Sequence, residues 1–465
     1  MDARNLPPEL AAAAGNLGHL VSTMEAGVPY ASALLTRNSG LQIVVNNREQ
    51  QVSEISPNQG LVLAAWNGAW FEEAASALLI PEHMQELARQ LADRVEIFPS
   101  SAAIDPGPPG QAHFATPCAQ DPALLSPREK LDMCRELHSK ARHLDQRIVN
   151  VVVRYLETKE SKAFANRAKA LSQNVLRLRL TVEMVVSDGQ QLQYDWSTKE
   201  GTGGLELIQV TDQDLQKLCD SAVSLLAAGR VPPGMYQVIC TPDVSGVIAH
   251  EAFGHGVEMD MFLKHRARSE QYLGRPIASP LVNLLDDPSY PGGHGSYFFD
   301  DEGQLSAPTH IIRRGTFERG ISDLFSAHSL GTPRSANGRR ESFERKIYTR
   351  MSNTFFARGE TPVQKMIEGI DRGVYLNKTS SGMEDPKGWG MQVTSHYGEE
   401  IVHGRLTGRR FTQVGITGYV PEILQSIDAV GDDFILTGGT CGKGHKEWVP
   451  VSSGGPHLRL KARLG

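Results

Sequence analysis

The sequence contains few cysteines, no long apolar run and no excess of basic residues. Its five cysteines are odd in number and lie far apart, at Cys118, Cys134, Cys219, Cys240 and Cys441. This usage argues against a disulfide framework and favours a cytoplasmic setting. No apolar stretch reaches the ~18 residues that a membrane-spanning helix requires, and the first residues lack the basic and apolar regions of a signal peptide.

Charge and length narrow the class of protein further. The 47 Lys and Arg residues are outnumbered by 53 Asp and Glu residues, which leaves a formal net charge of −6. This balance provides no electrostatic basis for nucleic-acid binding, so we expect neither nucleic acid nor a membrane as a partner. The 465 residues suffice for two or three domains of ordinary size.

The start of the chain alternates between helical and strand-like patterns. Residues 9–26 and 72–94 have helical periodicity. Short alternating runs between them predict strands over 31–36, 41–46, 51–55 and 60–65. The first two runs are separated by Asn38-Ser39-Gly40, a residue combination typical of a turn.

A segment rich in proline, alanine and glycine follows over residues 99–122 and predicts a linker. After it, Ser126 and Pro127 have the signature of a helix start. The alternating run 175–187 predicts a sheet with one solvated face, and Thr211 is placed to cap a further helix.

These patterns predict an α+β fold with two domains. Residues 1–230 form an N-terminal α/β domain with antiparallel hairpins and helices, in which subdomains of about 1–98 and 123–230 are joined by the linker. Residues 231–465 form a larger β-rich domain, because helical patterns become scarce there and short strands with glycine turns predominate. Its main helix is predicted over 245–259 and carries a motif with clear chemical content.

That motif is His250-Glu251-Ala252-Phe253-Gly254-His255. Two imidazoles and an adjacent carboxylate are the groups of a hydrolytic zinc site, which needs nitrogen ligands and a general base. The common zincin pattern has its histidines four residues apart on one helix face, whereas here they are five apart. On a regular helix, five residues turn through about 500° and leave the two side chains about 140° apart.

The two histidines can therefore share a metal ion only if the helix breaks or contains a π-bulge between them. Gly254, directly before the second histidine, is the residue that permits such a distortion. The motif alone also allows another interpretation, in which a glycine-flanked helix uses both histidines for local hydrogen bonds.

Further sequence blocks follow the motif in a defined order. They are Asp300-Asp301-Glu302-Gly303, Asn337-Gly338-Arg339-Arg340, Arg350-Met351-Ser352-Asn353-Thr354, Val430-Gly431-Asp432-Asp433 and Gly439-Thr440-Cys441-Gly442-Lys443. Together with the motif and its flank up to Asp260, these blocks closely resemble the TldD/PmbA family, also called modulators of DNA gyrase, and specifically its TldD-type zinc metallopeptidases.

The resemblance implies a peptidase with Zn²⁺ as its cofactor. His250, His255 and Cys441 would be the metal ligands, and Glu251 would be the catalytic general base that activates a metal-bound water. Two imidazoles and one thiolate leave the fourth position that catalysis requires. Taken without the resemblance, Cys441 could equally be a small buried apolar side chain.

Other residues have further possible roles. Glu258 and Asp260 are candidates for hydrogen bonds to the histidine ligands, and exposure to solvent is the alternative for Glu258. His403 and the pair Arg339-Arg340 are candidates for stabilising an oxyanion. The two arginines could instead pair with the acidic residues 300–302 in a structural network.

The C-terminal tail departs from the family pattern. The segment after Cys441 is one residue longer and lacks the usual glutamine, which makes His445 a candidate for an additional ligand. The departure also allows a specialised branch, such as a tailoring enzyme that acts on a peptide-like natural-product intermediate.

The resemblance further implies extended or unfolded peptides as substrates and a dimer, either a homodimer or a heterodimer with a related subunit. The alternative to an enzyme is a non-hydrolytic partner subunit or binding protein that retains a metal site for structure. The intact Glu251 argues against this alternative, because a structural zinc site needs no adjacent base.

Overall fold

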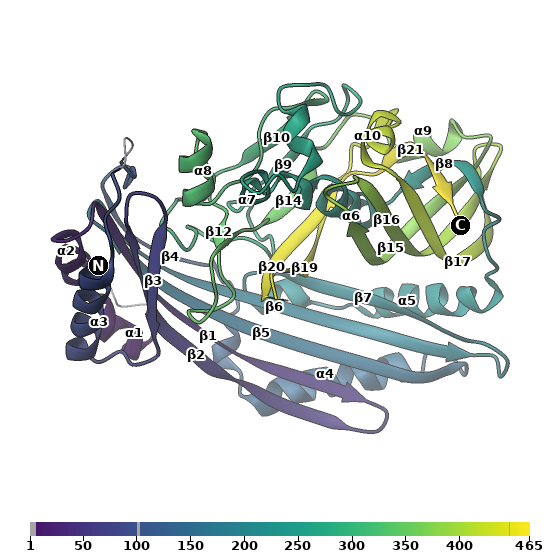
Figure 1. Ribbon diagram of the computed structural model, residues 1–465. Coiled ribbons are helices and arrows are strands. Elements are labelled where there is room, and N and C mark those ends of the chain that lie inside the picture. Colours follow the sequence, from purple (N-terminus) through teal and green to yellow (C-terminus); the bar gives the residue numbers. More distant parts are fainter. Residues whose placement is uncertain (1–5, 100–102, 446) are drawn as a thin grey trace.

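The computed structural model describes residues 6–99, 103–445 and 447–465 and confirms a mixed helix-and-sheet fold. A layer of long strands from the N-terminal half lies beneath a group of shorter strands and helices from the C-terminal half (Figure 1). Among the residues described, no helix combines the length and apolar character needed to cross a membrane.

The N-terminal sheet has seven strands in the order β3-β2-β1-β5-β6-β4, and β7 also pairs with β6. Its strands are β1 (Tyr30–Asn46), β2 (Gln50–Trp66), β3 (Phe71–Ser76), β4 (Gly110–Ala115), β5 (Ile148–Asn166), β6 (Lys169–Ser187) and β7 (Leu192–Thr202). The long central pairs are antiparallel, whereas β4 runs parallel to β6. Leu178, Leu180 and Val182 of β6 are buried, as the predicted alternation requires.

The predicted turn at Asn38-Ser39-Gly40 is wrong, because β1 continues through this segment. The register with β2 shifts between Asn38 and Gly40, which marks a β-bulge. A Cβ atom on Gly40 would lie 2.1 Å from the carbonyl oxygen of Glu157 on β5. The glycine therefore allows two backbones to approach closely within a long strand. Sequence alone does not distinguish such a glycine from one in a turn.

In the described part of the chain, five helices cover the N-terminal sheet. They are α1 (Pro8–Ala14), α2 (Leu17–Glu25), α3 (Pro81–Arg94), α4 (Pro127–Arg142) and α5 (Asp212–Ser224). The predicted helix over 9–26 is thus divided into α1 and α2, and the segment 72–94 contains β3 before α3. The side chains of Ser126 and Thr211 cap α4 and α5, and both caps were expected from the sequence.

The C-terminal half forms two six-stranded sheets with the motif helix between them. The first has the order β17-β16-β15-β8-β21-β18, and β17 also pairs with β21, so five of its strands close into a ring. Its strands are β8 (Gly234–Cys240), β15 (Arg372–Glu384), β16 (Gly390–Val402), β17 (Arg405–Tyr419), β18 (Ala429–Val430) and β21 (Leu458–Leu464).

The second of these sheets has the order β11-β10-β9-β14-β20-β19. Its strands are β9 (Leu284–Asp286), β10 (Thr309–Arg313), β11 (Thr316–Phe317), β14 (Asn353–Phe356), β19 (Ile435–Lys443) and β20 (Glu447–Gly455). Helix α6 (Pro242–Val247) packs against β15, β19 and β20, so both sheets support the segment that leads into the motif.

Candidate metal centre

The motif lies on a helix that changes its geometry along its length. Helix α6 continues into a π-helical segment, η4 (Ile248–Gly254), and then into a 3₁₀ turn, η5 (His255–Val257). The backbone N–H of His255 donates to the carbonyl oxygen of His250, which is the five-residue bond of a π-helix. The predicted distortion between the two histidines is confirmed, and the wider turn brings them to the same side.

Gly254 is required by the packing of this segment. A Cβ atom at this position would lie 2.1 Å from Sδ of Met351 and 3.3 Å from the carbonyl oxygen of Ala249. Met351 is completely buried. The absent side chain therefore lets the widened helix pack directly against the segment that precedes β14.

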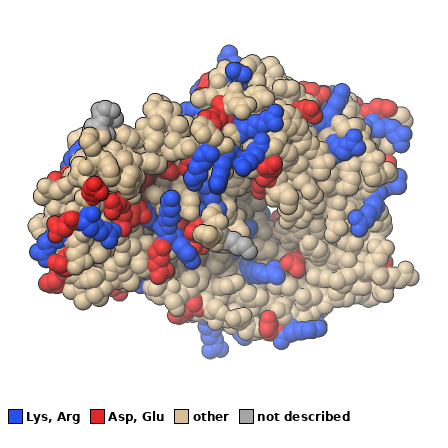
Figure 2. Space-filling model, viewed as in Figure 1, with Lys and Arg blue, Asp and Glu red and all other residues tan. Residues whose placement is uncertain are grey.

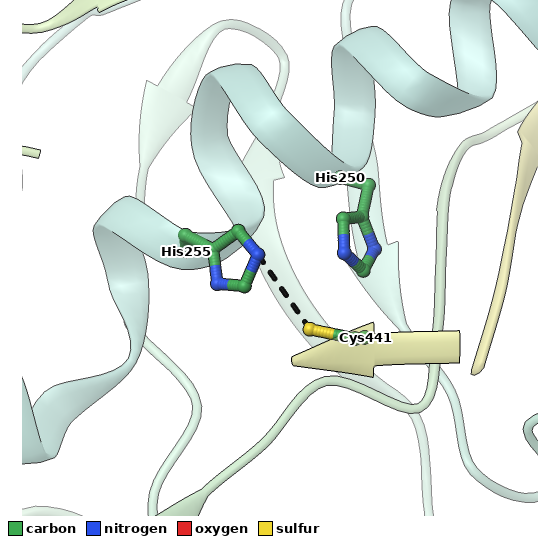
Figure 3. A group of neighbouring side chains, drawn as sticks. All are labelled: His250, His255 and Cys441. Atoms are coloured by element: carbon green, nitrogen blue, oxygen red, sulfur yellow. Dashed lines mark hydrogen bonds between the residues drawn. The ribbon is translucent and has the colours of Figure 1, made fainter. Parts of the chain in front are cut away.

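Cys441 of β19 lies beside both histidines, about 190 residues further along the chain. Figure 3 shows the imidazoles of His250 and His255 and the thiol of Cys441 converging from one helix and one strand. Sγ of Cys441 is 3.5 Å from Nε2 of His255, and the nearest ligand atoms of all three residues lie within 4.8 Å of one another.

The donor set suits a zinc ion. Bond lengths of about 2.0–2.1 Å to nitrogen and 2.3 Å to sulfur in a tetrahedral site place N and S ligands about 3.5–3.6 Å apart, which matches the distance from Cys441 to His255. Nδ1 of His250 is buried without a hydrogen-bond partner in the described part of the chain. The cluster therefore has unused bonding capacity and the ligand types of a structural or catalytic zinc site.

The three side chains perturb one another electrostatically. Burial alone would raise the pKa of the Cys441 thiol, but the imidazoles of His255 and His250 hold this pKa well below its ordinary value. Burial alone would lower the pKa of His255, but the thiol group and Glu258 raise it. A thiolate is the form of cysteine that binds metals, so the site favours the ligand form of Cys441.

Two carboxylates and a lysine lie behind His255. Oε2 of Glu258 is 3.4 Å from Nδ1 of His255, and Nζ of Lys443 donates to Glu258 at 3.0 Å and to Asp260 at 2.7 Å. Glu258 is 2% exposed and Asp260 8%, so the alternative of solvent exposure is wrong for Glu258. Glu258 is in place to orient the His255 ring.

Glu384, at the end of β15, is a neighbouring carboxyl group that the sequence does not point to. Both its oxygens are buried without a partner in the described residues, as is Nε1 of Trp389. A Cβ atom on Gly256 would lie 2.9 Å from Oε1 of Glu384. Burial raises the pKa of Glu384 to about 9, so the group is protonated at neutral pH.

The two arginines of the Asn337-Gly338-Arg339-Arg340 block have structural contacts. The Arg339 guanidinium donates to two backbone carbonyls, those of Met351 at 2.6 Å and Pro450 at 2.8 Å. Arg340 pairs with Glu73 of the N-terminal sheet at 2.7 Å, and its backbone N–H donates to Asp301. A structural network is therefore present, although the guanidinium groups have other partners than the expected acidic block.

The remaining sequence candidates lie away from the cluster. The side chain of His403 is 80% exposed and pairs with Asp371 at 2.6 Å. His445 is exposed in the turn between β19 and β20 and does not belong to the group of His250, His255 and Cys441.

The metal centre opens onto a cleft of about 860 Å³ that His250 and Glu251 both line. The cleft lies where β7 and α5 of the N-terminal half face β15 and β19 of the C-terminal half, and Figure 2 shows the molecule hollowed between these two parts. Gly382 of β15 faces Glu251, since a Cβ atom there would lie 2.6 Å from Cγ of the glutamate.

Several further residues of the cleft could not be identified from the sequence. Nζ of Lys378 donates to Asp195 at 2.5 Å and to the carbonyl oxygen of Trp196 at 2.6 Å, which links the N-terminal sheet to β15. On another wall of the cleft, Nε2 of His457 forms a hydrogen bond of 2.6 Å with the hydroxyl group of Tyr375. Only the tertiary packing makes these residues neighbours of the motif.

Comparisons with known proteins identify relatives of this chain. Residues 233–463 match the sequence profile of the PmbA/TldA metallopeptidase C-terminal domain. The chain is 30% identical to a metalloprotease from Methanothermobacter thermautotrophicus over 96% of this chain and 97% of that protein. It is 28% identical to a zinc metalloprotease TldD homolog from Saccharolobus solfataricus over 54% of this chain and 56% of the homolog.

Solved structures show the same fold. A modulator of a DNA gyrase from Thermotoga maritima aligns with a TM-score of 0.78 at 18% identity, over 96% of this chain and 98% of that one. TldE from Thermococcus kodakarensis aligns with a TM-score of 0.74 at 18% identity, over 96% and 99% of the two chains. The chain accordingly belongs to the PmbA/TldD family of metallopeptidases.

Proposed function

We propose that this protein is a zinc-dependent peptidase that hydrolyses peptide bonds in extended or unfolded peptides. His250, His255 and Cys441 bind the zinc ion, and Glu251 is the general base. The observation that carries the proposal is the convergence of these three ligand side chains beside a cleft that His250 and Glu251 line. A site with three protein ligands retains the open position of a catalytic zinc centre.

Zinc bound at this site supplies Lewis acidity, which polarises a peptide carbonyl and makes water more acidic. Glu251 takes the proton from the attacking water and passes it to the leaving amine. Glu258 holds the ring of His255 through Nδ1. Burial alone would raise the pKa of Glu258, but Lys443, His255 and Arg350 together lower this pKa to about 2 and keep the group ionised.

The edge strand β19 supports an extended peptide as the substrate. It pairs with β20 on one side and lies at the end of its sheet. Thr440 lies opposite Pro450, which has no N–H group, and alternate residues of an antiparallel strand direct their backbone groups away from the partner. Thr440 lines the cleft directly before Cys441, so its backbone groups are placed to pair with a substrate strand.

We also propose that the protein works in the cytoplasm as a dimer, formed by two copies or with a related subunit. This part of the proposal rests on the family resemblance of the sequence, which implies paired subunits. Native mass spectrometry of the purified chain, alone and coexpressed with a related subunit, tests this part. A monomer in both preparations would contradict it.

The function is tested by the Glu251→Ala variant. We expect this variant to retain zinc, measured by elemental analysis, and to lose hydrolysis of a peptide library followed by mass spectrometry. The wild-type protein, assayed in parallel, provides the positive control. Unchanged hydrolysis in the variant would remove Glu251 from the mechanism, and absence of hydrolysis in the zinc-loaded wild type would favour the non-hydrolytic alternative.

A further inference from the structure

A second cavity of about 660 Å³ lies between the N-terminal sheet and the segment around α7 (Met259–Phe262). None of its lining residues belongs to the cleft of the metal centre. Strands β1 to β3 form one wall, and segments near residues 263, 324 and 347 form the other. Its volume is within the range of about 300–1,000 Å³ that is typical of small-molecule sites.

Apolar and aromatic side chains dominate this cavity. Leu34, Val62 and Phe71 line the wall formed by the N-terminal sheet, and Phe325 and Tyr348 line the opposite wall. Trp70 borders the cavity from the turn before β3 and is 47% exposed. A ligand of this cavity therefore needs an apolar body that covers aromatic surface.

The carboxylates that border the cavity already have donors within the protein. Four have cationic partners and one accepts a hydroxyl and a backbone N–H. The contacts are Glu73 with Arg340 at 2.7 Å, Asp260 with Lys443 at 2.7 Å, Asp301 with Lys162 at 2.6 Å, Glu302 with Arg334 at 3.6 Å, and Asp323 with Thr349 at 3.0 Å and Ser326 at 2.6 Å. These acids offer little attraction to a cationic ligand.

Two lysines at the cavity provide exposed positive charge. Lys264 and Lys346 both line it and are both exposed. Neither forms an ion pair with a carboxylate in the described part of the chain, and Nζ of Lys346 lies 5.7 Å from the centre of the Tyr348 ring. Figure 2 shows Lys and Arg side chains gathered over the middle of this face, beside the hollowed region.

We propose that this cavity binds an organic monocarboxylate with an apolar body, such as a medium-chain fatty acid. The apolar chain lies against Leu34, Phe71 and Phe325, and the carboxylate binds the ammonium groups of Lys264 and Lys346. The carboxylate pairs with the exposed lysines, and the apolar chain covers the exposed aromatic surface of the same site.

The test is a titration with decanoate below its micelle concentration, followed by tryptophan fluorescence and by calorimetry. Trp70 reports directly on this cavity, and the Trp70→Phe variant identifies its share of the signal. Because a carboxylate can also bind a metal ion, the titration is repeated on protein treated with a chelator. Decanol and decylamine serve as the neutral and cationic analogues.

We expect saturable decanoate binding that persists after chelation and weakens at least tenfold in the Lys264→Ala/Lys346→Ala variant. Lys461→Ala, at an exposed lysine of β21, is the matched control and should bind as the wild type does. Binding that disappears on chelation would assign the carboxylate to the metal centre instead. Equal affinity for decanol or decylamine, or an unaffected double variant, would equally overturn the proposal.

Discussion

The substitution Gly254→Ala tests whether close packing at this glycine maintains the distorted motif helix. The added Cβ atom would lie 2.1 Å from Sδ of Met351 and 3.3 Å from the carbonyl oxygen of Ala249. Since Met351 is fully buried, its thioether has no solvent to move into. Either Met351 or the helix must shift, and a shift of the helix moves His255 relative to Cys441.

The magnitude follows from two opposing effects. Overpacking of a buried contact costs about 1–3 kcal/mol, whereas alanine in place of glycine in a helix interior returns about 0.8–1 kcal/mol. The steric effect is the larger over most of this range, so we expect a net loss of up to about 2 kcal/mol in the free energy of unfolding. If about 1.4 kcal/mol of this cost is borne by the metal site, zinc affinity falls about tenfold.

Urea denaturation measures the stability change, and competition with a chelator of known affinity measures zinc binding. Gly18→Ala in α2 is the matched control, because nothing lies within 4 Å of its added Cβ atom. This control should gain about 0.5–1 kcal/mol from helix propensity alone. A Gly254→Ala variant that also gains stability and keeps wild-type zinc affinity would refute the reasoning.

Three further predictions concern the surroundings of the motif. Cys441→Ser should lower the zinc content found by elemental analysis while the far-UV circular dichroism spectrum is retained, because a hydroxyl is a poorer zinc ligand than a thiolate; full zinc content would contradict the third ligand. Lys443→Met leaves the buried carboxyl groups of Glu258 and Asp260 without their cation. The free energy of unfolding, measured by urea denaturation, should fall by about 3–5 kcal/mol. A fall below about 1 kcal/mol would mean that other groups compensate these carboxyl groups. Glu384→Gln should stabilise the protein relative to the wild type, and increasingly so from pH 5 to pH 8. Burial raises the pKa of Glu384 from 4.5 to about 9, so in this pH range the unfolded chain releases a proton that the folded chain keeps. The folded state of the wild type thus loses stability as pH rises through this window, by an amount on the order of 2–4 kcal/mol, and equal pH profiles of variant and wild type in urea denaturation would contradict the burial of this group.

The sequence correctly predicted those helices and strands that depend on interactions between neighbouring residues. The helix caps at Ser126 and Thr211 and the alternation along β6 follow from neighbouring residues, and all three are present. The turn predicted at Asn38-Ser39-Gly40 is wrong. Gly40 is needed because its backbone packs closely against Glu157 on another strand, not because the chain turns there. Residue type alone does not separate a glycine of a turn from a glycine of a bulge.

Within the six-residue motif, some features follow from the sequence and others depend on tertiary packing. The spacing of His250 and His255 is enough to exclude a regular helix that presents both to one ion, and Gly254 marks where the distortion occurs. By contrast, the contact between Gly254 and Met351, which makes the glycine necessary, depends on how the motif helix packs against a distant segment of the chain.

Residue identity and spacing along single elements specify the ligand types, the candidate base and the α+β class, and the ordered blocks carry the family resemblance. Which of these groups meet in space depends on how distant segments pack. The tertiary structure brings Cys441 to 3.5 Å from His255, buries Glu258 and Glu384 beside the metal centre, and forms the cleft from both halves of the chain. Such contacts join residues far apart in sequence, and they exist only once the sheets have packed on the motif helix.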